Sequence, residues 1–273
     1  MSLLLVGDDV VDLGRERTRA KASDRRFLER VLAPGEIRLV EESPAPDLEL
    51  WTLWACKEAA YKVHSKALGE PPTFVHADYR VERPLPETSR GGASAAGGTV
   101  LPAGAAGEGE ATTARVRWDG GAVAVDIGRS AAVVHAVAWD RSDQETREPP
   151  RLPTTHRLEA QLGELDDAEA LWAGPLSRLL ERFTRAEADA IHSRASAAVR
   201  LAARHSLARL LAVEERRLEI VCAPGVTGRR PPAVRLDGAP CEADVSFTHD
   251  GRWIAWAASV PRRHRARRTR VGS

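Results

Sequence analysis

The pattern of apolar and polar residues predicts a buried strand, a short helix and a long helix in the first part of the chain. Residues 3–6 are continuously apolar, and this run predicts a strand that ends in an exposed acidic turn. Residues 24–31 predict a short helix, which the Pro-Gly pair at 34–35 ends. Residues 50–65 carry apolar side chains at helical spacing, so we expect a long helix there.

Strands are expected to follow the long helix. Apolar residues predict them at residues 74–81, 114–118, 122–127 and 131–139. The sequence Asp119-Gly120-Gly121 between two of these runs is typical of a hairpin turn. Residues 84–113 are rich in Gly, Ala, Ser, Thr and Pro, and they predict a flexible surface loop.

A second set of elements follows a polar, proline-containing segment, residues 141–155, which predicts a linker. We expect the part after it to open with helical material. Residues 197–211 predict an amphipathic helix with Arg200, Arg204 and Arg209 on its polar positions. Strands are predicted at residues 218–222, 233–236, 245–248 and 253–260.

The two parts contain similar segments in the same order. Residues 29–36 are echoed by residues 181–187, and residues 57–62 are echoed by residues 204–209. Because each part then ends in several strands, we expect a duplicated helix-plus-sheet unit. The predicted fold is therefore α+β with two similar lobes, a pseudo-dimer: lobes at 1–140 and 156–260, a linker at 141–155 and a basic tail at 261–273.

Composition narrows the class of protein. With 273 residues, 43% hydrophobic and 29% charged, the chain has the composition of a soluble globular protein. The net charge of +1 and the absence of a long apolar run predict no nucleic-acid partner and no membrane span. The basic tail could attract phosphates, or it could be a solvated end. Three cysteines without a CxxC pair, and an apolar start without a basic region, favour a cytoplasmic protein without a signal peptide.

Three residues of the first lobe could form a metal and phosphate site. Asp9 follows the predicted first strand, and Glu58 lies in the long helix with Lys62 one turn later on the same face. Mg²⁺ is often held by one or two carboxylates together with substrate phosphates. Asp9 and Glu58 could supply these carboxylates while Lys62 contacts the phosphates. A solvated Glu58–Lys62 pair on the helix surface is the alternative.

The segments around these residues resemble a known family. Residues 7–12, Gly-Asp-Asp-Val-Val-Asp, resemble the start of the small holo-acyl-carrier-protein synthases, and residues 57–62, Lys-Glu-Ala-Ala-Tyr-Lys, match the Lys-Glu-Ala helix of that family. The chain is thus similar to 4′-phosphopantetheinyl transferases, which move the phosphopantetheine arm of coenzyme A onto a carrier-protein serine. This resemblance implies that Asp9 and Glu58 bind magnesium and that Lys62 contacts phosphate.

The second lobe carries more of the same resemblance. Arg200 and Arg209 have the Arg-x(8)-Arg spacing that opens the coenzyme-binding half of the two-lobed, surfactin-synthetase-activating type. Residues 228–231, Gly-Arg-Arg-Pro, resemble the Gly-Lys-Pro turn of that type, and residues 245–249, Val-Ser-Phe-Thr-His, resemble its Ser-His strand end. The resemblance implies that coenzyme A is bound by Lys62, Arg200, Arg229, Arg230, Ser246 and His249.

The order of the lobes is exchanged relative to these two-lobed enzymes, in which the histidine segment comes first. We therefore predict a circular permutation and one site between the lobes, where Asp9 and His249 meet. In this interpretation His205 takes the place of Glu58, and Asp126 takes the place of His249. The remaining histidines have no such context and are expected to be structural or surface residues: His64, His76, His135, His156 and His192.

The implied reaction is a Mg²⁺-dependent transfer that releases adenosine 3′,5′-bisphosphate. Asp9, Glu58 and Lys62 would be catalytic, with Glu58 accepting the proton of the serine and Lys62 stabilising the charge of the leaving group. The expected partners are coenzyme A and an apo acyl or peptidyl carrier protein. These belong to fatty acid, polyketide or nonribosomal peptide biosynthesis, and we expect a cytoplasmic monomer.

Two alternatives stay open. Two-lobed members usually carry a second acid two residues after the first, and this position is Val11 here. A water or Asp12 could fill that place. If activity has been lost instead, the chain would be a carrier-protein or coenzyme A binding module. In the other alternative, the first lobe acts as a trimer like the small synthases, which would leave residues 228–231 and 245–249 without a role.

Overall fold

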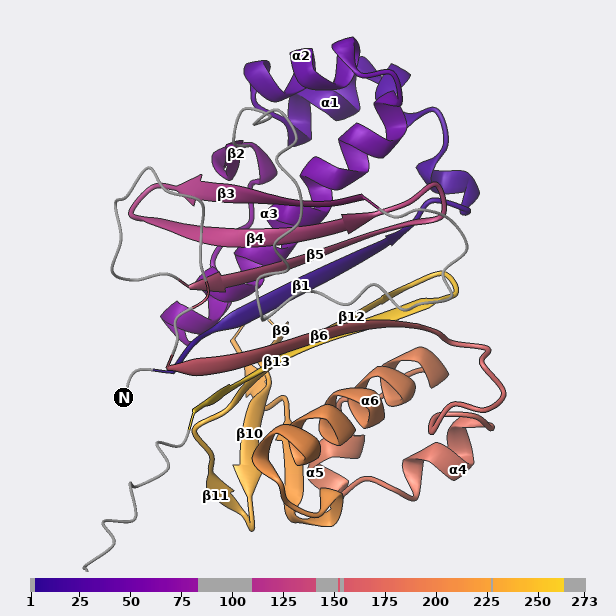
Figure 1. Ribbon diagram of the computed structural model, residues 1–273, viewed down its shortest axis with the longest axis vertical. Coiled ribbons are helices and arrows are strands. Elements are labelled where there is room, and N and C mark those ends of the chain that lie inside the picture. Colours follow the sequence, from indigo (N-terminus) through magenta and orange to yellow (C-terminus); the bar gives the residue numbers. More distant parts are fainter. Residues whose placement is uncertain (1–2, 83–109, 141–151, 153–154, 227, 263–273) are drawn as a thin grey trace, which may run out of the picture.

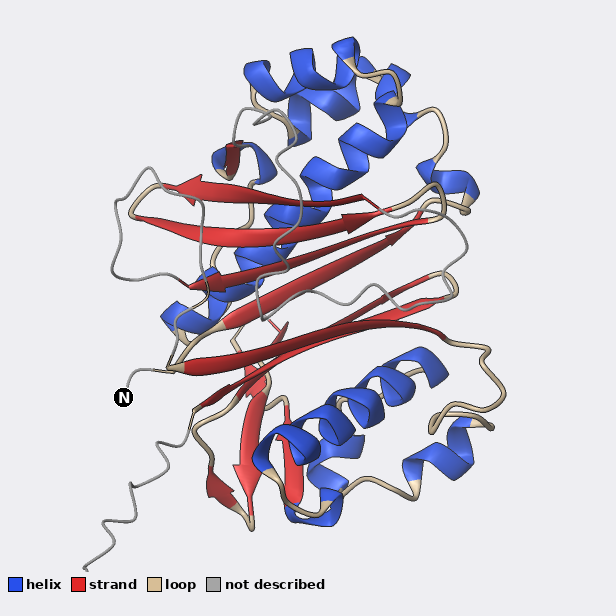
Figure 2. Cartoon of the chain, in the orientation of Figure 1, coloured by secondary structure: helices blue, strands red, loops and turns tan. Residues whose placement is uncertain are grey.

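Two α+β units are stacked along the long axis of the molecule, each with a sheet towards the centre and helices on the outside (Figure 1). The computed structural model describes residues 3–82, 110–140, 152, 155–226 and 228–262. Both units combine helices and antiparallel strands (Figure 2), so the predicted α+β class is confirmed. In this part of the chain, no helix has both the length and the apolar character needed to cross a bilayer.

The first unit contains a five-stranded antiparallel sheet in the order β1-β5-β4-β3-β2. Its strands are β1 (Val6–Asp12), β2 (Arg80–Glu82), β3 (Glu110–Trp118), β4 (Gly121–Arg129) and β5 (Val133–Asp140). Its helices are α1 (Arg25–Val31), α2 (Pro34–Glu42) and α3 (Pro46–Leu68), with short 3-10 helices at Glu16–Thr18, Lys21–Ser23 and His76–Asp78.

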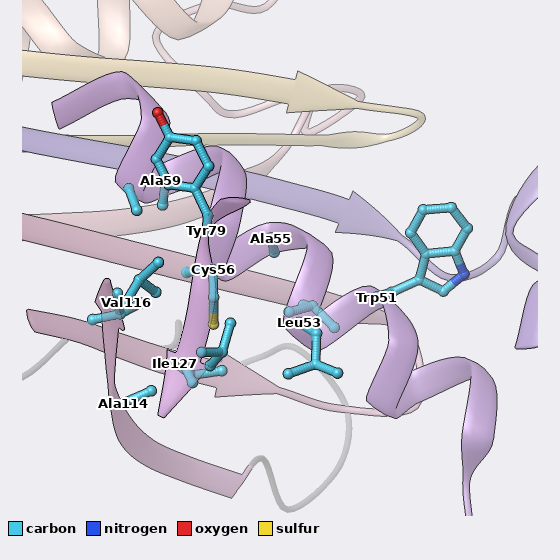
Figure 3. Close-up of a cluster of buried hydrophobic side chains, with 14 of the residues drawn as sticks. Trp51, Leu53, Ala55, Cys56, Ala59, Tyr79, Ala114, Val116 and Ile127 are labelled. Atoms are coloured by element: carbon cyan, nitrogen blue, oxygen red, sulfur yellow. The ribbon is translucent and has the colours of Figure 1, made fainter. Parts of the chain in front are cut away.

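The long helix α3 packs against one face of this sheet and forms the core of the first unit. A proline at its start and Gly69 after its end, with a left-handed φ of 76°, set its limits. Leu53 and Cys56 of the helix pack in one apolar cluster with Val116 and Ile127 of the strands (Figure 3). Helical spacing of apolar residues therefore predicted this element correctly.

Gly7 allows β1 to approach α3 closely. A Cβ atom at this position would lie 2.1 Å from the backbone oxygen of Ala59 and 3.1 Å from the Cβ of Lys62. Because no other residue fits there without a shift of the helix, the glycine fixes the distance between the two elements. Strand β1 therefore packs closely on α3, where Nζ of Lys66 donates to the backbone oxygen of Val6 and Nζ of Lys62 to that of Asp8.

The second unit contains a three-stranded sheet, β12-β13-β6, a second three-stranded sheet, β11-β10-β7, and a hairpin, β8-β9. Its strands are β6 (His156–Glu164), β7 (Leu218–Val221), β8 (Pro224–Gly225), β9 (Gly228–Arg229), β10 (Ala233–Leu236), β11 (Ala239–Pro240), β12 (Asp244–Asp250) and β13 (Trp253–Pro261). Its helices are α4 (Leu176–Leu180), α5 (Arg185–Ala188) and α6 (Arg194–Leu211), with a 3-10 helix at Glu215–Arg217.

The first strand of the chain and one of the last lie side by side (Figure 1). Backbone N–H groups of β1 donate to side chains of β12: Val6 to Asp244 at 2.7 Å, Asp8 to Ser246 at 3.0 Å, and Asp12 to Asp250 at 3.0 Å. The partners of each pair are 238 residues apart, so the strands run parallel in one register. Side chains of the second unit thus accept hydrogen bonds from the backbone N–H groups of β1, the edge strand of the first unit.

Three predictions about the first unit need correction. The strand expected at residues 3–6 is β1 (Val6–Asp12), so Asp9 lies within a strand rather than in an exposed turn after it. Both units contact β1, and its burial therefore extends through the acidic residues. Of the strand expected at residues 74–81, only β2 is formed, after the short helix His76–Asp78.

Two predictions about the second unit also need correction. It opens with β6 and not with a helix, because this strand pairs with β13 at the sheet centre. Arg200 and Arg204 are buried rather than on a polar helix surface, with 7% and 6% of their area exposed. Arg204 is paired inside the unit, where its guanidinium lies 3.4 Å from the carboxylate of Glu187.

Parts of three predicted segments lie outside the described residues. These are residues 84–109 of the predicted loop, most of the linker at 141–155 and the basic tail after residue 262. The last residues of the predicted loop, from Glu110, belong to strand β3 instead.

Candidate active site between the two units

Strand β1 and helix α3 bring three predicted site residues together. The Nζ atom of Lys62 donates to the backbone oxygen of Asp8 and to Oδ1 of Asp9, the latter at 3.3 Å. Glu58 makes a different contact, because its Oε1 lies 3.0 Å from Nε2 of His76. Lys62 is therefore bound to the strand, and the alternative of a simple Glu58–Lys62 surface pair is wrong.

The electrostatics of this group show an excess of negative charge. Burial raises the pKa of Asp9 to about 7; Lys62 opposes this shift, whereas Glu58 and Asp8 add to it. Burial disfavours the charged form of Lys62, but Asp9, Asp8 and Glu58 outweigh it and raise the pKa of the amine. A single lysine does not neutralise the acids around it, so a further cation would stabilise the site.

The residues present fit a magnesium ion that substrate phosphates help to hold. Among the described residues, no group of three or more His, Cys, Asp or Glu side chains forms a metal site. Asp9 and Glu58 together provide two hard oxygen donors, with 13% and 22% of their side chains exposed. Mg²⁺ commonly uses one or two carboxylates and keeps its other positions for water and phosphate.

The second unit reaches the same place through β12. The hydroxyl of Thr248 donates to Oδ1 of Asp9 at 3.2 Å, across the boundary between the units. The next residue, His249, is exposed; partial desolvation and the positive charges of Arg200 and Lys62 lower its pKa, which Asp250 partly offsets. Charges from both units thus act on His249, whose side chain points to the face of β12 opposite Thr248.

Arg200 and Phe247 support this end of β12. The guanidinium of Arg200 lies 4.6 Å from the ring centre of Phe247 and donates to the backbone oxygen and hydroxyl of Ser196. Its charge is close enough to lower the pKa of His249. Arg200 therefore contributes positive potential next to His249 while its position is fixed by packing.

Arg229 and Arg230 lie farther along the second unit, at the β8–β9 hairpin. Both are exposed, and Arg229 donates to the backbone oxygens of Cys222 and Asp189. In the described part of the chain, no hydrogen bond or ion pair connects either arginine to the Asp9 carboxylate. The structure therefore does not bring these two residues to the centre of the site.

Ser246 does not have the position expected of a coenzyme contact. Its side chain is buried, with 3% of the residue exposed, and its hydroxyl accepts the N–H of Asp8. Side chains alternate along a strand, so Ser246 points away from the face that carries Phe247 and His249. It connects β12 to β1, and its role in binding coenzyme A stays a prediction.

Asp12 and Asp126 also do not lie where the sequence interpretation expected them. The carboxylate of Asp12 accepts the N–H groups of Gly14 and Arg252, so it does not take the place of the missing acid at Val11. Asp126 points to the face of β4 opposite Ile127, which packs in the core of the first unit, whereas the exposed His249 shares a face of β12 with Phe247, which packs on the core of the second unit. Asp126 and His249 therefore do not correspond.

The sequence did not predict the contacts of two residues near the site. Thr248 was part of the matched strand end, but its contact with Asp9 depends on the register between the units. His76 was expected to be structural or on the surface, yet it contacts Glu58. A lone histidine in an apolar run predicts no ligand, so only the structure could identify it.

The protein thus has an α+β fold. Its candidate site combines two carboxylates and a lysine of the first unit with the end of strand β12, which carries His249, in the second unit. The family model of the 4′-phosphopantetheinyl transferase superfamily matches residues 5–92. This segment, which contains β1 and α3, is similar to that superfamily.

A curated relative is also similar to part of the chain. The chain is similar to a holo-[acyl-carrier-protein] synthase of Verminephrobacter eiseniae (strain EF01-2), with 31% identity over 75 residues. The match covers 28% of this chain and 57% of the relative, so the chain spans a little over half the length of that protein.

Proposed function

We propose that this protein transfers the 4′-phosphopantetheine arm of coenzyme A to a serine of an apo carrier protein. The observation that carries the proposal is that Asp9, which contacts Lys62 and is influenced electrostatically by Glu58, also accepts a hydrogen bond from Thr248 of the second unit. The match of residues 5–92 to the superfamily model and the similarity to a holo-[acyl-carrier-protein] synthase support this choice of reaction.

In the proposed reaction, the serine oxygen bonds to the β-phosphorus of coenzyme A, and the bond from that phosphorus to the bridging oxygen breaks. Adenosine 3′,5′-bisphosphate leaves with the bond electrons. Glu58 is part-exposed and accepts the serine proton. The ammonium of Lys62 stabilises the negative charge that develops on the diphosphate. Mg²⁺, held by Asp9 and Glu58, would supply further neutralisation of that charge when bound.

The second unit supplies the proposed coenzyme A contacts. A phosphate near His249 would meet the positive charges that lower the pKa of this histidine, those of Arg200 and Lys62. The exposed Arg229 and Arg230 are proposed as outer contacts only. We also propose that the active species is a cytoplasmic monomer, because β12 of the same chain already covers the edge of β1.

A transfer assay tests the proposed function. The purified protein is incubated with coenzyme A, Mg²⁺ and several apo carrier proteins, and mass spectrometry measures the gain of one phosphopantetheine group. We expect this gain on at least one carrier and none when Mg²⁺ is removed by chelation. Bound coenzyme A without transfer to any carrier would favour the binding module instead.

A further inference from the structure

His76 contacts the proposed proton acceptor, although the proposed reaction does not use it. Its Nε2 atom lies 3.0 Å from Oε1 of Glu58, and 19% and 22% of the two side chains are exposed. In the neutral tautomer with a proton on Nε2, the ring donates a hydrogen bond to the carboxylate. No other hydrogen bond to the Glu58 carboxylate occurs within the described residues.

Two aromatic side chains pack directly against the His76 ring. The ring centres of Trp54 and Phe74 each lie 4.0 Å from the imidazole centre, at interplanar angles of 31° and 38°. Trp54 is stacked in turn on Phe27, at 5.8 Å and 18°. The imidazole therefore has little room to rotate, and its Nε2 atom stays directed at Glu58.

The backbone of His76 is fixed as well. Its carbonyl oxygen accepts a hydrogen bond of 3.1 Å from Nζ of Lys57, whose side chain is fully buried. The same Nζ atom donates to Glu36 at 2.6 Å, and Glu36 accepts the N–H of Val81 at 2.8 Å. Both ends of the segment that carries His76 are thus attached to one buried ion pair.

We propose that His76 is a positioning residue that holds the Glu58 carboxylate in the orientation needed for metal binding and for accepting the serine proton. This inference rests on the proposed function. A glutamate on a helix has three side-chain torsions, and a rigid hydrogen-bond donor restricts them before any ligand arrives. Partners behind a metal-binding carboxylate act in this way on affinity and activity.

Two variants separate the hydrogen bond from the packing of the ring. His76→Phe keeps an aromatic ring between Trp54 and Phe74 but removes the donor. His76→Gln retains an N–H donor at a similar reach and loses the ring. Binding of Mn²⁺ without coenzyme A is measured by the electron paramagnetic resonance signal of the free ion, and kcat and KM are measured with Mg²⁺.

For His76→Phe we expect Mn²⁺ affinity and kcat to fall about tenfold or more, with KM for coenzyme A nearly unchanged. His76→Gln should recover most of both. His64→Phe is the matched control. His64 lies on the same helix as Glu58, and the substitution removes its hydrogen bond of 2.7 Å to Tyr79 without changing a contact of Glu58. It should leave both measurements at wild-type values.

Wild-type Mn²⁺ affinity and kcat in His76→Phe would overturn the inference. Equal losses in His76→Phe and His76→Gln would also overturn it, because the hydrogen bond would then not be the cause. If the wild-type protein binds Mn²⁺ but transfers nothing, only the proposed function fails, and the Mn²⁺ measurements still decide the role of His76. A wild-type protein that does neither refutes both.

Discussion

The two long helices carry the same buried ion pair but different residues beside it. In the first unit, Lys57 of α3 bonds Glu36, which also accepts the N–H of Val81 on the strand after the helix. In the second unit, Arg204 of α6 contacts Glu187, which accepts the N–H of Ile220 at 2.9 Å. Both acids also accept the N–H at the start of their own short helix, from Ala33 and Thr184.

The next position along each helix is where the units diverge. Glu58 contacts His76 and acts electrostatically on Asp9, whereas His205 is exposed and lies beside Glu215. The buried ion pair is thus a structural element common to both units. The residue that follows it in each helix differs: an acid in α3 and a histidine in α6. This agreement supports the interpretation of a duplicated unit, while the circular permutation stays a prediction.

Replacing Glu58 should have the largest effect on activity and should show that α3 and α6 differ in function. Glu58→Gln is expected to lower kcat by about 10²–10⁴-fold, because the proton acceptor is lost, with little change in coenzyme A affinity. Single-turnover kinetics and calorimetric binding measure the two quantities. His205→Gln, at the matching position of α6, should keep full activity. An active Glu58→Gln protein would show that the difference between the helices has no catalytic meaning.

The shared ion pair predicts similar losses of stability in the two units. Lys57→Met and Arg204→Met each leave a buried carboxylate unpaired, and we expect a loss of about 3–5 kcal/mol in the free energy of unfolding. Urea denaturation measures it. A large loss in one variant and none in the other would contradict the equivalence of the two pairs.

The pH dependence of stability tests a buried acid of the first unit. Burial raises the pKa of Asp126 from 3.8 to about 6. Its contribution is therefore fully present below pH 3.8 and is lost as the pH rises through 6. Asp126→Asn should stabilise the protein at pH 8 by up to about 3 kcal/mol and have little effect near pH 4. An equal shift of Tm at both pH values would refute this assignment.

The smallest effect is expected for the coenzyme contact of the second unit. His249→Ala should weaken coenzyme A binding about tenfold, the cost of one hydrogen bond to a charged group. Titration calorimetry measures the Kd. Exposed Arg229 supplies the control, since Arg229→Ala should change the Kd less. Unchanged affinity in His249→Ala would sink the assignment of one site between the units.

Periodicity predicted α1, α3, α6 and several strands but missed α2, which begins at Pro34, and β6; the resemblance predicted that Asp9, Glu58 and Lys62 lie together. The length of β1 was missed, because its burial depends on a unit far along the chain. The role of Ser246 was missed for the same reason: only the register between β1 and β12 shows that its hydroxyl serves a backbone N–H. The orientation of His76 depends on packing that no local pattern encodes.

The parallel contact of β1 and β12 has a consequence for how the protein matures. Its paired residues are separated by 238 positions, so the ribosome must add that whole length after β1 before the strands can meet. At about 5–20 residues per second, the wait is on the order of ten to fifty seconds. During this time the edge of β1 is uncovered and the site is incomplete. A truncated or stalled chain would therefore expose a strand edge that can pair with other chains, and it would not gain activity.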